Sequence, residues 1–482
     1  MTDQDNEIDR EAGLLPPSAE TQGDVSRAGG FATFMRSPGV KFIIIGVLTV
    51  LLLIPTLLVW ALVEERAERA NEVSARISSG WGGPQIVNGP YLAVPMLVNR
   101  TQNNNGTITT MQVQEWALLM PEELKVDTKL DTEARKLSIY SLPVYNAKMK
   151  FSGRFGTDLR QSLTQIEGTP DLDRAFLVMN IADISGIRSN ADIKIDGGGA
   201  LPFQPGMKSI KGLKSGYSEY DSSQAYAQSD TGINRPIDRA LIEKGFAFEM
   251  DLSLNGSAKF SLAPAGQTTM FTASANWPDP GFEGLFLPET KTITKQGFEA
   301  AWTIPYLARG VDKVIASSVL PLGGNLMSVN LVEPVKFYQI ISRTLKYSVG
   351  FISLMFFAVF IIELKGGRMV HWVQYVLTGL ALIIFYILLL ALSEHLGFMI
   401  AYGIAATATT LLIAFYVGTV TGSRRSGVSL AVVLGLSYAV MYLILREDEY
   451  ALLAGALISF VTIAATMYFT RNIDWSGSRE VK

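Results

Sequence analysis

The sequence predicts an integral membrane protein with six transmembrane helices, both termini on the cytoplasmic side, and a large mainly-β domain outside the membrane. Three observations support this fold class. Apolar residues make up 48% of the 482 residues and charged residues only 18%, whereas soluble domains carry about 25% charged residues. The uncharged residues gather in six long runs. Between the first and second runs, the sequence instead shows short alternating stretches that are typical of β-strands.

The first apolar run covers residues 42–63 and contains no charged residue. About 20 apolar residues are enough to cross the hydrocarbon core of a bilayer. A cleaved signal peptide is the alternative, but its apolar region is about 7–15 residues long and precedes a small-residue cleavage site. This run is longer and ends in Trp60-Ala61-Leu62-Val63. We therefore predict a signal anchor, preceded by a disordered cytoplasmic tail over residues 1–38, which is polar and rich in Gly, Pro and Ser.

Five further runs predict a C-terminal bundle over residues 345–470, with a short cytoplasmic tail at 471–482. The loops between them alternate in charge: basic Lys365 and Arg368, then Glu394-His395, then Arg424-Arg425, then the acidic stretch 446–449. Because Lys and Arg in short loops favour the cytoplasm, this alternation places the segment after the first run on the outer side. The runs are 347–364, 373–392, 396–420, 428–445 and 450–469.

Residues 64–344 form the predicted external domain. Glu-first i,i+4 pairs with Arg over residues 65–76 indicate that the first helix continues out of the membrane, and we expect it to end at Ser78-Ser79-Gly80. Period-two alternation over 147–155, 246–254 and 268–275 predicts strands, and the best arrangement for them is a sandwich-like pair of sheets. We also expect a short helix within 157–166 and a long exposed loop over 211–236.

Several kinds of chemistry are excluded by composition. The chain has no cysteine and only two histidines, which rules out disulfides, thiolate catalysis and cysteine- or histidine-rich metal centres. No nucleotide-binding or hydrolase motif occurs, so we expect no cofactor and no enzymatic activity. A pair of catalytic carboxylates in the external domain stays open. The net charge of -3 gives no reason to expect nucleic acid as a partner.

Ionisable residues near the membrane are the main candidates for function, because charge in a bilayer is costly. Glu394 and His395 interrupt an apolar stretch, so they could relay protons or sense pH. The simpler interpretation, which we favour, is a solvated two-residue loop in the headgroup zone. Glu363 lies beside Lys365 near the end of the second run, where snorkelling to the interface would account for it.

Four stretches resemble the CreD family of bacterial inner-membrane proteins. The resemblance implies a multi-pass protein of the bacterial inner (cytoplasmic) membrane with its large domain in the periplasm. It also implies a role in cell-envelope integrity, stress response, and tolerance of colicins and β-lactams, with no catalytic residues to carry over. The four stretches are WGGPQ at 81–85 with GPYLAVP at 89–95, WPDPGFEGLFLP at 277–288, LVEPV at 331–335 with FYQ at 337–339, and VQY at 373–375 with LSEHLGF at 392–398.

These stretches supply four more candidate residues: Trp81, Gln85, Trp277 and Glu333. In each case a turn or core role is the favoured interpretation, and Glu333 before Pro334 would fix how the chain enters the membrane. Our preferred hypothesis is a non-enzymatic protein, surrounded by membrane lipids, whose external domain binds an envelope component or protein partner. A transporter or lipid-handling protein is the alternative, and a membrane-anchored hydrolase is the third. The oligomeric state is open.

Overall fold

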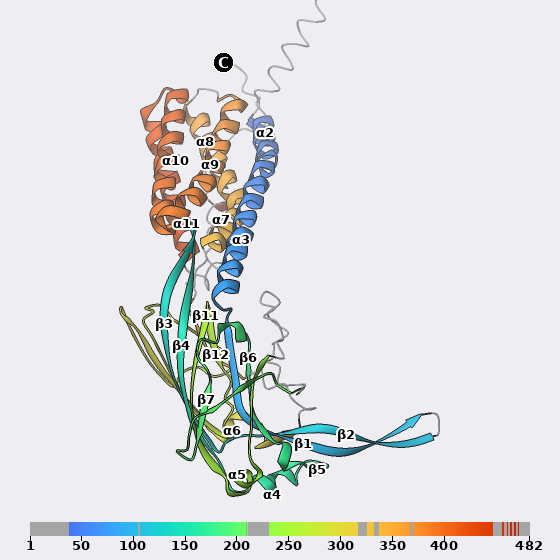
Figure 1. Ribbon diagram of the computed structural model, residues 1–482. Helices are drawn as coiled ribbons and strands as arrows, with labels where there is room; N and C mark the ends of the chain where they lie inside the picture. The colour runs from blue at the N-terminus through green and yellow to red at the C-terminus, as the bar shows by residue number, and fades with distance from the viewer. Residues whose placement is uncertain are drawn as a thin grey trace, which may run out of the picture. The chain divides into compact units, whose positions relative to one another are not determined.

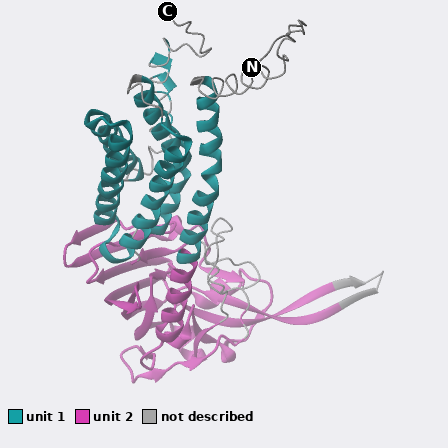
Figure 2. Cartoon of the chain, turned by 90° about the horizontal axis from the view of Figure 1, so that it is seen from above, with its two compact units in different colours: residues 1–66, 337–482 teal, residues 67–336 magenta. Residues whose placement is uncertain are grey.

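The computed structural model describes residues 38–104, 107–208, 210, 231–316, 325–331, 337–366 and 370–446, together with seven single positions between 456 and 471. The chain divides into two compact units (Figure 2): residues 1–66 with 337–482, and residues 67–336. The first unit is helical and the second consists mainly of strands.

The helical unit agrees with the predicted spans wherever they are described. Within the described residues, four helices are long and apolar enough to cross a membrane, or five if a pair bent by 50° counts as one span. The sixth predicted run, 450–469, lies almost wholly outside the described residues, as do the predicted tails 1–38 and 471–482. The helices are α2 (Pro38–Leu51), α3 (Leu53–Trp81), α7 (Phe337–Lys346), α8 (Ser348–Gly366), α9 (Trp372–Leu396), α10 (Phe398–Thr421) and α11 (Arg424–Arg446) (Figure 1).

The second predicted span, 347–364, matches α8, but the external domain ends earlier than we expected. We expected the external domain to reach residue 344, but the boundary between the units lies after Lys336, and α7 belongs to the helical unit. One face of α7 is buried, including Ile340 and Ile341, while its last turn carries Arg343 and Lys346. Because these charges interrupt the apolar run, hydropathy alone could not detect this amphipathic helix.

The first span continues into a long helix, as the sequence predicts. Helices α2 and α3 together form one candidate span over Gly39–Trp81. The helix ends at Trp81, one residue beyond the expected Ser78–Gly80 stop. Gly82 then has a φ of 138° and donates its N–H to the Ser78 carbonyl at 2.8 Å, so glycine closes the helix where a Cβ would be strained.

The strand-rich unit contains two mixed sheets. The ten-stranded sheet runs β14 (Gly281–Glu283), β18 (Met327–Asn330), β12 (Lys259–Leu262), β1 (Gln85–Asn104), β6 (Phe176–Ile181), β10 (Gly232–Pro236), β9 (Gln204–Pro205), with β2 (Thr107–Leu119), β5 (Thr169–Pro170) and β17 (Val314–Ala316) beside this path. The eight-stranded sheet runs β15 (Thr290–Thr294), β16 (Gly297–Ile304), β13 (Thr268–Ala275), β3 (Glu123–Leu137), β4 (Tyr140–Phe155), β11 (Phe246–Ser257), β7 (Asp192–Ile195), β8 (Leu201–Pro202).

The two sheets share one hydrophobic core. Phe260 from the ten-stranded sheet lies 6.3 Å from Phe271 of the eight-stranded sheet, and Phe271 stacks on Trp302 at 4.8 Å. Strand β3 alternates buried and more exposed residues over its first ten positions, which is the pattern of a strand with one face on a core. The prediction of a large β-rich region is confirmed.

The predicted 211–236 loop was wrong at its end. Gly232–Pro236 form strand β10, which pairs with the wholly buried β6, and residues 211–230 lie outside the described part. The sequence GINRP has no clear alternation, so its strand conformation depends on pairing with β6 rather than on local preference. The short helix α4 (Leu159–Leu163) falls inside the expected 157–166 segment. Helices α5 (Arg239–Lys244) and α6 (Tyr306–Arg309) are also short.

Candidate functional site

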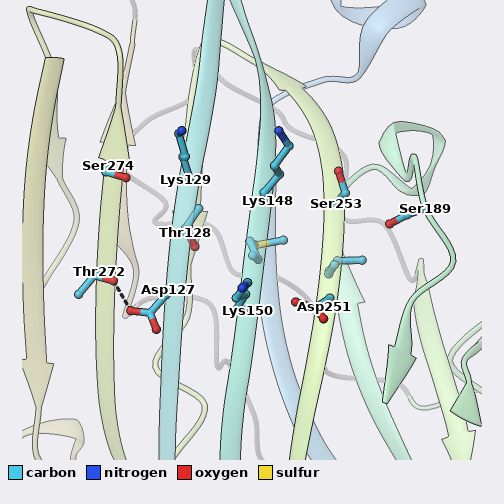
Figure 3. Close-up of a pocket in the computed structure, with 12 residues that line it drawn as sticks. Asp127, Thr128, Lys129, Lys148, Lys150, Ser189, Asp251, Ser253, Thr272 and Ser274 are labelled. Carbon is cyan, nitrogen blue, oxygen red and sulfur yellow. Dashed lines mark hydrogen bonds between the residues drawn. The ribbon is translucent and has the colours of Figure 1, made fainter. Parts of the chain in front are cut away.

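The candidate site in the strand-rich unit is a hollow on one face of the eight-stranded sheet. It has a volume of about 500 Å³ and is lined by residues of β3, β4, β11 and β13, with Ser189 from a neighbouring loop (Figure 3). Most of its lining side chains are charged or carry a hydroxyl. The hollow therefore offers both charges and hydroxyl groups to a ligand.

Strand register sorts these side chains into two rows. The first row reads Thr272, Asp127, Lys150 and Asp251 across four adjacent strands. Two residues further along each strand, the second row reads Ser274, Lys129, Lys148 and Ser253. Because residues at i and i+2 of a strand project from the same face, both rows project from the sheet face that bears the hollow.

Some of these charges are already engaged. The Thr272 hydroxyl donates to Asp127 at 2.5 Å, and Lys148 Nζ donates to Asp131 at 2.7 Å. By contrast, no ion pair involves Lys150 or Asp251 within the described residues. Lys150 lies directly opposite Asp251 on β11 and directly opposite Asp127 on β3. This cation and this carboxylate are thus available to a ligand.

A second cluster lies where helix α3 enters the sheets. The Trp81 indole N–H donates to the Tyr145 carbonyl at 3.2 Å. The Arg135 guanidinium lies 3.6 Å from the centre of the Trp81 ring. Arg188 lies 5.6 Å from the same ring and also donates to the Trp81 carbonyl at 3.3 Å. These contacts fix the end of the helix through stacking of cations on an aromatic ring.

Gln85 joins the first strand to two other segments of the unit. Its side chain is fully buried, and its Nε2 donates to the carbonyls of Asp183 at 3.1 Å and Asn255 at 2.8 Å. Its Oε1 accepts from the Asp183 N–H at 3.3 Å. Three backbone groups, two of Asp183 and one of Asn255, therefore depend on this one buried amide, which supports the structural role that we favoured from the sequence.

The Asp183 carboxylate contributes further hydrogen bonds to this cluster of Gly83, Gln85, Asp183, Ser185 and Asn255, which we call the joint. It accepts from the Gly83 N–H at 2.9 Å, and from the Ser185 N–H and hydroxyl at 3.0 and 2.5 Å. Partial burial acts to raise the pKa of Asp183, but the hydrogen bonds from Gly83 and Ser185 outweigh it and lower the pKa below its ordinary value. The charged form is the one that holds this joint.

The hollow and this joint are linked by polar contacts. The Ser253 hydroxyl lies 3.3 Å from Asn146 Oδ1, and the side-chain amides of Asn146 and Asn255 lie 2.9 Å apart. The carbonyl of Asn255 in turn accepts from Gln85. A ligand that contacts Ser253 would therefore lie three contacts away from the start of β1.

In the helical unit, we expected Glu363 to extend to the membrane interface, but its side chain is buried. Its carboxylate is 6% exposed and forms an ion pair with Lys41. It also accepts from the Tyr375 hydroxyl at 2.8 Å and from the Val370 N–H at 3.0 Å. The snorkelling interpretation was therefore wrong: cation, hydroxyl and N–H together satisfy this carboxylate inside the bundle.

The Glu394-His395 pair is not a loop either. Both residues belong to the last turn of α9, and the chain reverses at Gly397, which has a φ of 78°. Glu394 accepts from the Tyr338 hydroxyl at 3.2 Å and lies 3.8 Å from Arg66 Nη1. The side chain of His395 is exposed. Since adjacent residues project from different sides of a helix, the structure does not bring this pair together as a relay.

Comparison with known proteins explains the arrangement of the chain. The profile of a family described as inner membrane protein CreD matches residues 37–476. The chain belongs to the CreD family. It is 31% identical over 431 residues to inner membrane protein CreD of Escherichia coli strain K12, a match that covers 88% of this chain and 91% of that protein. The resemblance inferred from the four stretches is confirmed.

Two candidates from the CreD-like stretches remain, Trp277 and Glu333. The first packs against the hydrophobic core, and the second lies outside the described residues. Trp277 is partly buried against the core. It follows Asn276, whose side chain accepts from the Thr132 N–H and hydroxyl, both at 2.7 Å. Glu333 lies outside the described residues. In the stretch at 89–95, Gly89 has a φ of 125°, and an added Cβ would lie 2.9 Å from the Val178 carbonyl. Only glycine fits there.

Sequence reasoning missed the hollow of this CreD-family chain. The sequence did carry a signal, because β3 has a charged residue at every second position from Glu123 to Glu133, and the residues between these positions are buried up to Thr132. What the sequence could not provide was the order β13-β3-β4-β11, which places these residues beside Lys150 and Asp251. Within the described residues, no group of three or more His, Asp or Glu side chains could hold a metal ion.

Proposed function

We propose that this CreD-family protein supports cell-envelope integrity and envelope-stress tolerance by binding an envelope component in the hollow of its strand-rich unit. In this proposal the unit lies in the periplasm, and the helices anchor it in the inner membrane. The family match and the E. coli relative, named as an inner membrane protein, support the membrane part. The protein acts by binding and not by catalysis.

The observation that carries the proposal is the position of Lys150 between Asp127 and Asp251 in one row of the hollow. A ligand that fits must present both an anionic and a cationic group, together with hydroxyls for the serine and threonine side chains. Soluble peptidoglycan fragments carry carboxylates, amines and sugar hydroxyls on one short molecule. We therefore assign this class of ligand to the hollow.

The same row argues against the hydrolase hypothesis. Asp127 and Asp251 lie two strands apart, which corresponds to about 9–10 Å between their backbones. Lys150 projects from the strand between them, so each acid faces a cation rather than the other acid. A carboxylate beside a lysine is suited to holding a charged ligand more than to exchanging protons with it.

The binding proposal is tested with the full chain in lipid nanodiscs and a soluble muropeptide bearing free carboxylates and an amine. We expect Lys150→Ala to weaken binding at least tenfold, because a charge-assisted hydrogen bond contributes about 1.5–3 kcal/mol. Lys244→Ala, which removes an exposed lysine of α5 outside the hollow, is the matched control. Equal affinity of both variants and the unaltered protein would refute the hollow as the site.

The periplasmic location is tested separately. A reporter enzyme that is active only outside the cytoplasm is expected to be active when fused after residue 200 and inactive when fused after Arg425, in the basic loop that we assign to the cytoplasmic side. An inactive residue-200 fusion would overturn the proposed topology, whatever the hollow binds.

A second candidate function, transport or lipid handling by the bundle, is favoured by one observation. The hydroxyls of Tyr386 and Ser393, both buried on α9, have no hydrogen-bond partner in the described part of the chain. Unpaired hydroxyls are costly inside a membrane and would be satisfied by a passing polar group. If Tyr386→Phe with Ser393→Ala leaves envelope tolerance unchanged, this candidate is rejected.

A further inference from the structure

The closed end of the β3–β4 hairpin extends beyond the neighbouring strands of its sheet. Strand β3 pairs with β13 only as far as Leu130, and β4 pairs with β11 only from Val144 onward. From Ala134 to Pro143 the hairpin pairs with no third strand in the described part of the chain. Residues 134–141, which we call the tip, therefore project by about 13 Å.

The tip combines exposed apolar side chains with positive charge. It reads ARKLSIYS, with two cations and no acidic residue. Leu137 is 41% exposed and Ile139 is 39% exposed, and Tyr140 is half-buried. Two-residue hairpin turns in water favour Asn-Gly or Asp-Gly, but this turn is Ser138-Ile139. Apolar and tyrosine side chains beside Lys or Arg are typical of segments that lie at a membrane–water interface.

The two cations of the tip differ in their contacts. Arg135 forms an ion pair with Glu133 at 2.8 Å and stacks on the Trp81 ring. Lys136 is exposed and forms no ion pair within the described residues. Lys136 is thus the cation that an anionic group outside the protein can reach.

The base of the tip lies where the chain both enters and leaves the strand-rich unit. Helix α3 enters near Ser78, whose hydroxyl lies 2.8 Å from that of Ser257. The described part of the unit ends at Leu331, whose N–H donates to the Ala258 carbonyl at 2.7 Å. The Ala258 N–H donates in turn to the carbonyl of Pro143 at 2.9 Å. Entry, exit and the base of the tip therefore meet in one place.

Both connections lead directly to apolar helices. Helix α3 is continuous with the first candidate span, and α7 begins at Phe337, six residues after Leu331. Six residues reach at most about 20 Å when fully extended, so the chain ties this end of the unit closely to its membrane helices. Within the unit, Figure 1 shows the tip pointing back along α3, toward the helix residues that lead to the span.

We propose that the tip docks on the headgroup layer of the bilayer that the chain itself spans. Leu137, Ile139 and Tyr140 enter the boundary between headgroups and acyl chains, and Lys136 binds an anionic phospholipid headgroup. A bilayer matches both features, because burial of apolar side chains and attraction of cations to anionic lipid act together in interfacial binding. Docking depends neither on the side of the membrane that the unit occupies nor on the ligand of the hollow.

The absence of cysteine from the chain allows a single fluorescent label at the tip. Ser138→Cys, labelled with a polarity-sensitive fluorophore, is reconstituted as the full chain in nanodiscs of phosphatidylethanolamine and phosphatidylglycerol. Part of the lipid carries a nitroxide quencher high on the acyl chain. We expect blue-shifted emission and roughly twofold quenching by the nitroxide lipid, since docked side chains lie at the headgroup–acyl boundary.

Lys244→Cys with the same label is the matched control. Lys244 is exposed on α5, and the next residue, Gly245, lies against the carbonyl of Phe155 at the other end of β4. About 15 residues of strand, or roughly 50 Å, separate that end from the tip. We therefore expect no blue shift and no quenching at this position.

Two further variants test which side chains hold the tip in the lipid. Leu137→Ser with Ile139→Ser, in the labelled Ser138→Cys chain, is expected to remove most of the quenching, while hydrogen exchange of β4 and β11 verifies that the unit still folds. Lys136→Gln is expected to reduce the gain in quenching that phosphatidylglycerol gives over phosphatidylcholine.

Several results would overturn the docking proposal. Emission at Ser138→Cys that the nitroxide lipid does not quench would do so, and if it is also blue-shifted, protein covers the tip instead of lipid. Equal quenching at Lys244→Cys, or quenching that survives both serine substitutions, would mean that the label and not the tip enters the lipid. An unchanged gain from phosphatidylglycerol in Lys136→Gln would refute the headgroup contact. Muropeptide binding reports on the hollow alone, so the two proposals can fail separately.

Discussion

Lys41 and Glu363 form an ion pair although 322 residues separate them in the sequence. Lys41 lies near the start of the first span, and Arg66, which lies near Glu394, is 25 residues further along the same helix. That distance corresponds to about 37 Å of helix, slightly more than the roughly 30 Å hydrocarbon core. The first candidate span is thus held to the C-terminal helices by two carboxylates, Glu363 and Glu394, about one bilayer thickness apart along the helix.

The first prediction concerns the buried member of these pairs. Lys41→Met leaves the Glu363 carboxylate, which is 6% exposed, without its cation. Loss of one partner from a buried pair costs up to about 3–5 kcal/mol, so we expect a clear drop in the thermal stability of the full chain in nanodiscs. Lys41→Met with Glu363→Gln is expected to recover most of it, since no uncompensated charge remains.

Arg425→Met is the control for this experiment, because Arg425 is exposed at the start of α11. It removes a cation from the same unit without exposing a buried acid. If the single Lys41 variant and the double variant lose the same stability, the two side chains are not coupled and the pair does not fix the helix.

The second prediction separates Glu394 from its neighbour. Glu394→Ala removes the acceptor of the Tyr338 hydroxyl and the partner of Arg66, so hydrogen exchange is expected to increase in α7 and around residue 66. Because Arg66 is 39% exposed, the effect is about 1 kcal/mol or less. His395→Ala is expected to leave exchange unchanged. A larger effect from His395 than from Glu394 would show that the contacts of Glu394 do not stabilise this end of α9.

The membrane helices were largely predictable because hydropathy depends only on local sequence. The runs at 373–392, 396–420 and 428–445 correspond to α9, α10 and α11, with ends close to those observed. The missed helix α7 has charged residues on one face, and the missed strand β10 owes its conformation to β6. Neither leaves a signal in a sliding window, since each depends on a neighbour that is distant in sequence or on a face that only folding defines.

For the candidate residues, too, the sequence was informative about local features and not about distant contacts. The sequence could single out Glu363, Glu394, Trp81 and Gln85 as unusual residues at their positions, but not their partners. Lys41 pairs with Glu363, which lies 322 residues away in the sequence, and Gln85 donates to the carbonyl of Asn255, which lies 170 residues away. Contacts between residues so far apart in the sequence form only when the chain packs. The sequence therefore predicted that Glu363 reaches the interface, whereas in the structure its carboxylate is buried.

The third prediction concerns the joint between helix α3 and the sheets. Gln85→Ala leaves the carbonyls of Asp183 and Asn255 without their donor in a fully buried site. An unsatisfied buried polar group costs about 1–3 kcal/mol, so we expect faster hydrogen exchange over residues 183–187 and 253–257. Gln112→Ala, at an exposed position of β2, should leave these segments unchanged. Unaltered protection in Gln85→Ala would show that the amide does not hold the joint.

The last prediction is a pH dependence of the same joint. The pKa of Asp183 is lowered below its ordinary value of 3.8, because hydrogen bonds from Gly83 and Ser185 outweigh the opposing effect of burial. A carboxylate with a lowered pKa in the folded state contributes stability above its unfolded pKa and loses that contribution as the pH falls through the folded pKa. Asp183→Asn is therefore expected to weaken exchange protection of residues 183–187 by about 1 kcal/mol between pH 5 and pH 7.

Below pH 3.8 the unaltered protein begins to lose the same contribution, so the difference between the two proteins should shrink as its carboxyl becomes protonated. Exchange rates are compared after correction for the intrinsic effect of pH, with Asp279→Asn as the control, since Asp279 is exposed in a turn. A difference that stays constant down to pH 3 would mean that the shape of the side chain, and not its charge, holds Gly83 and Ser185 in place.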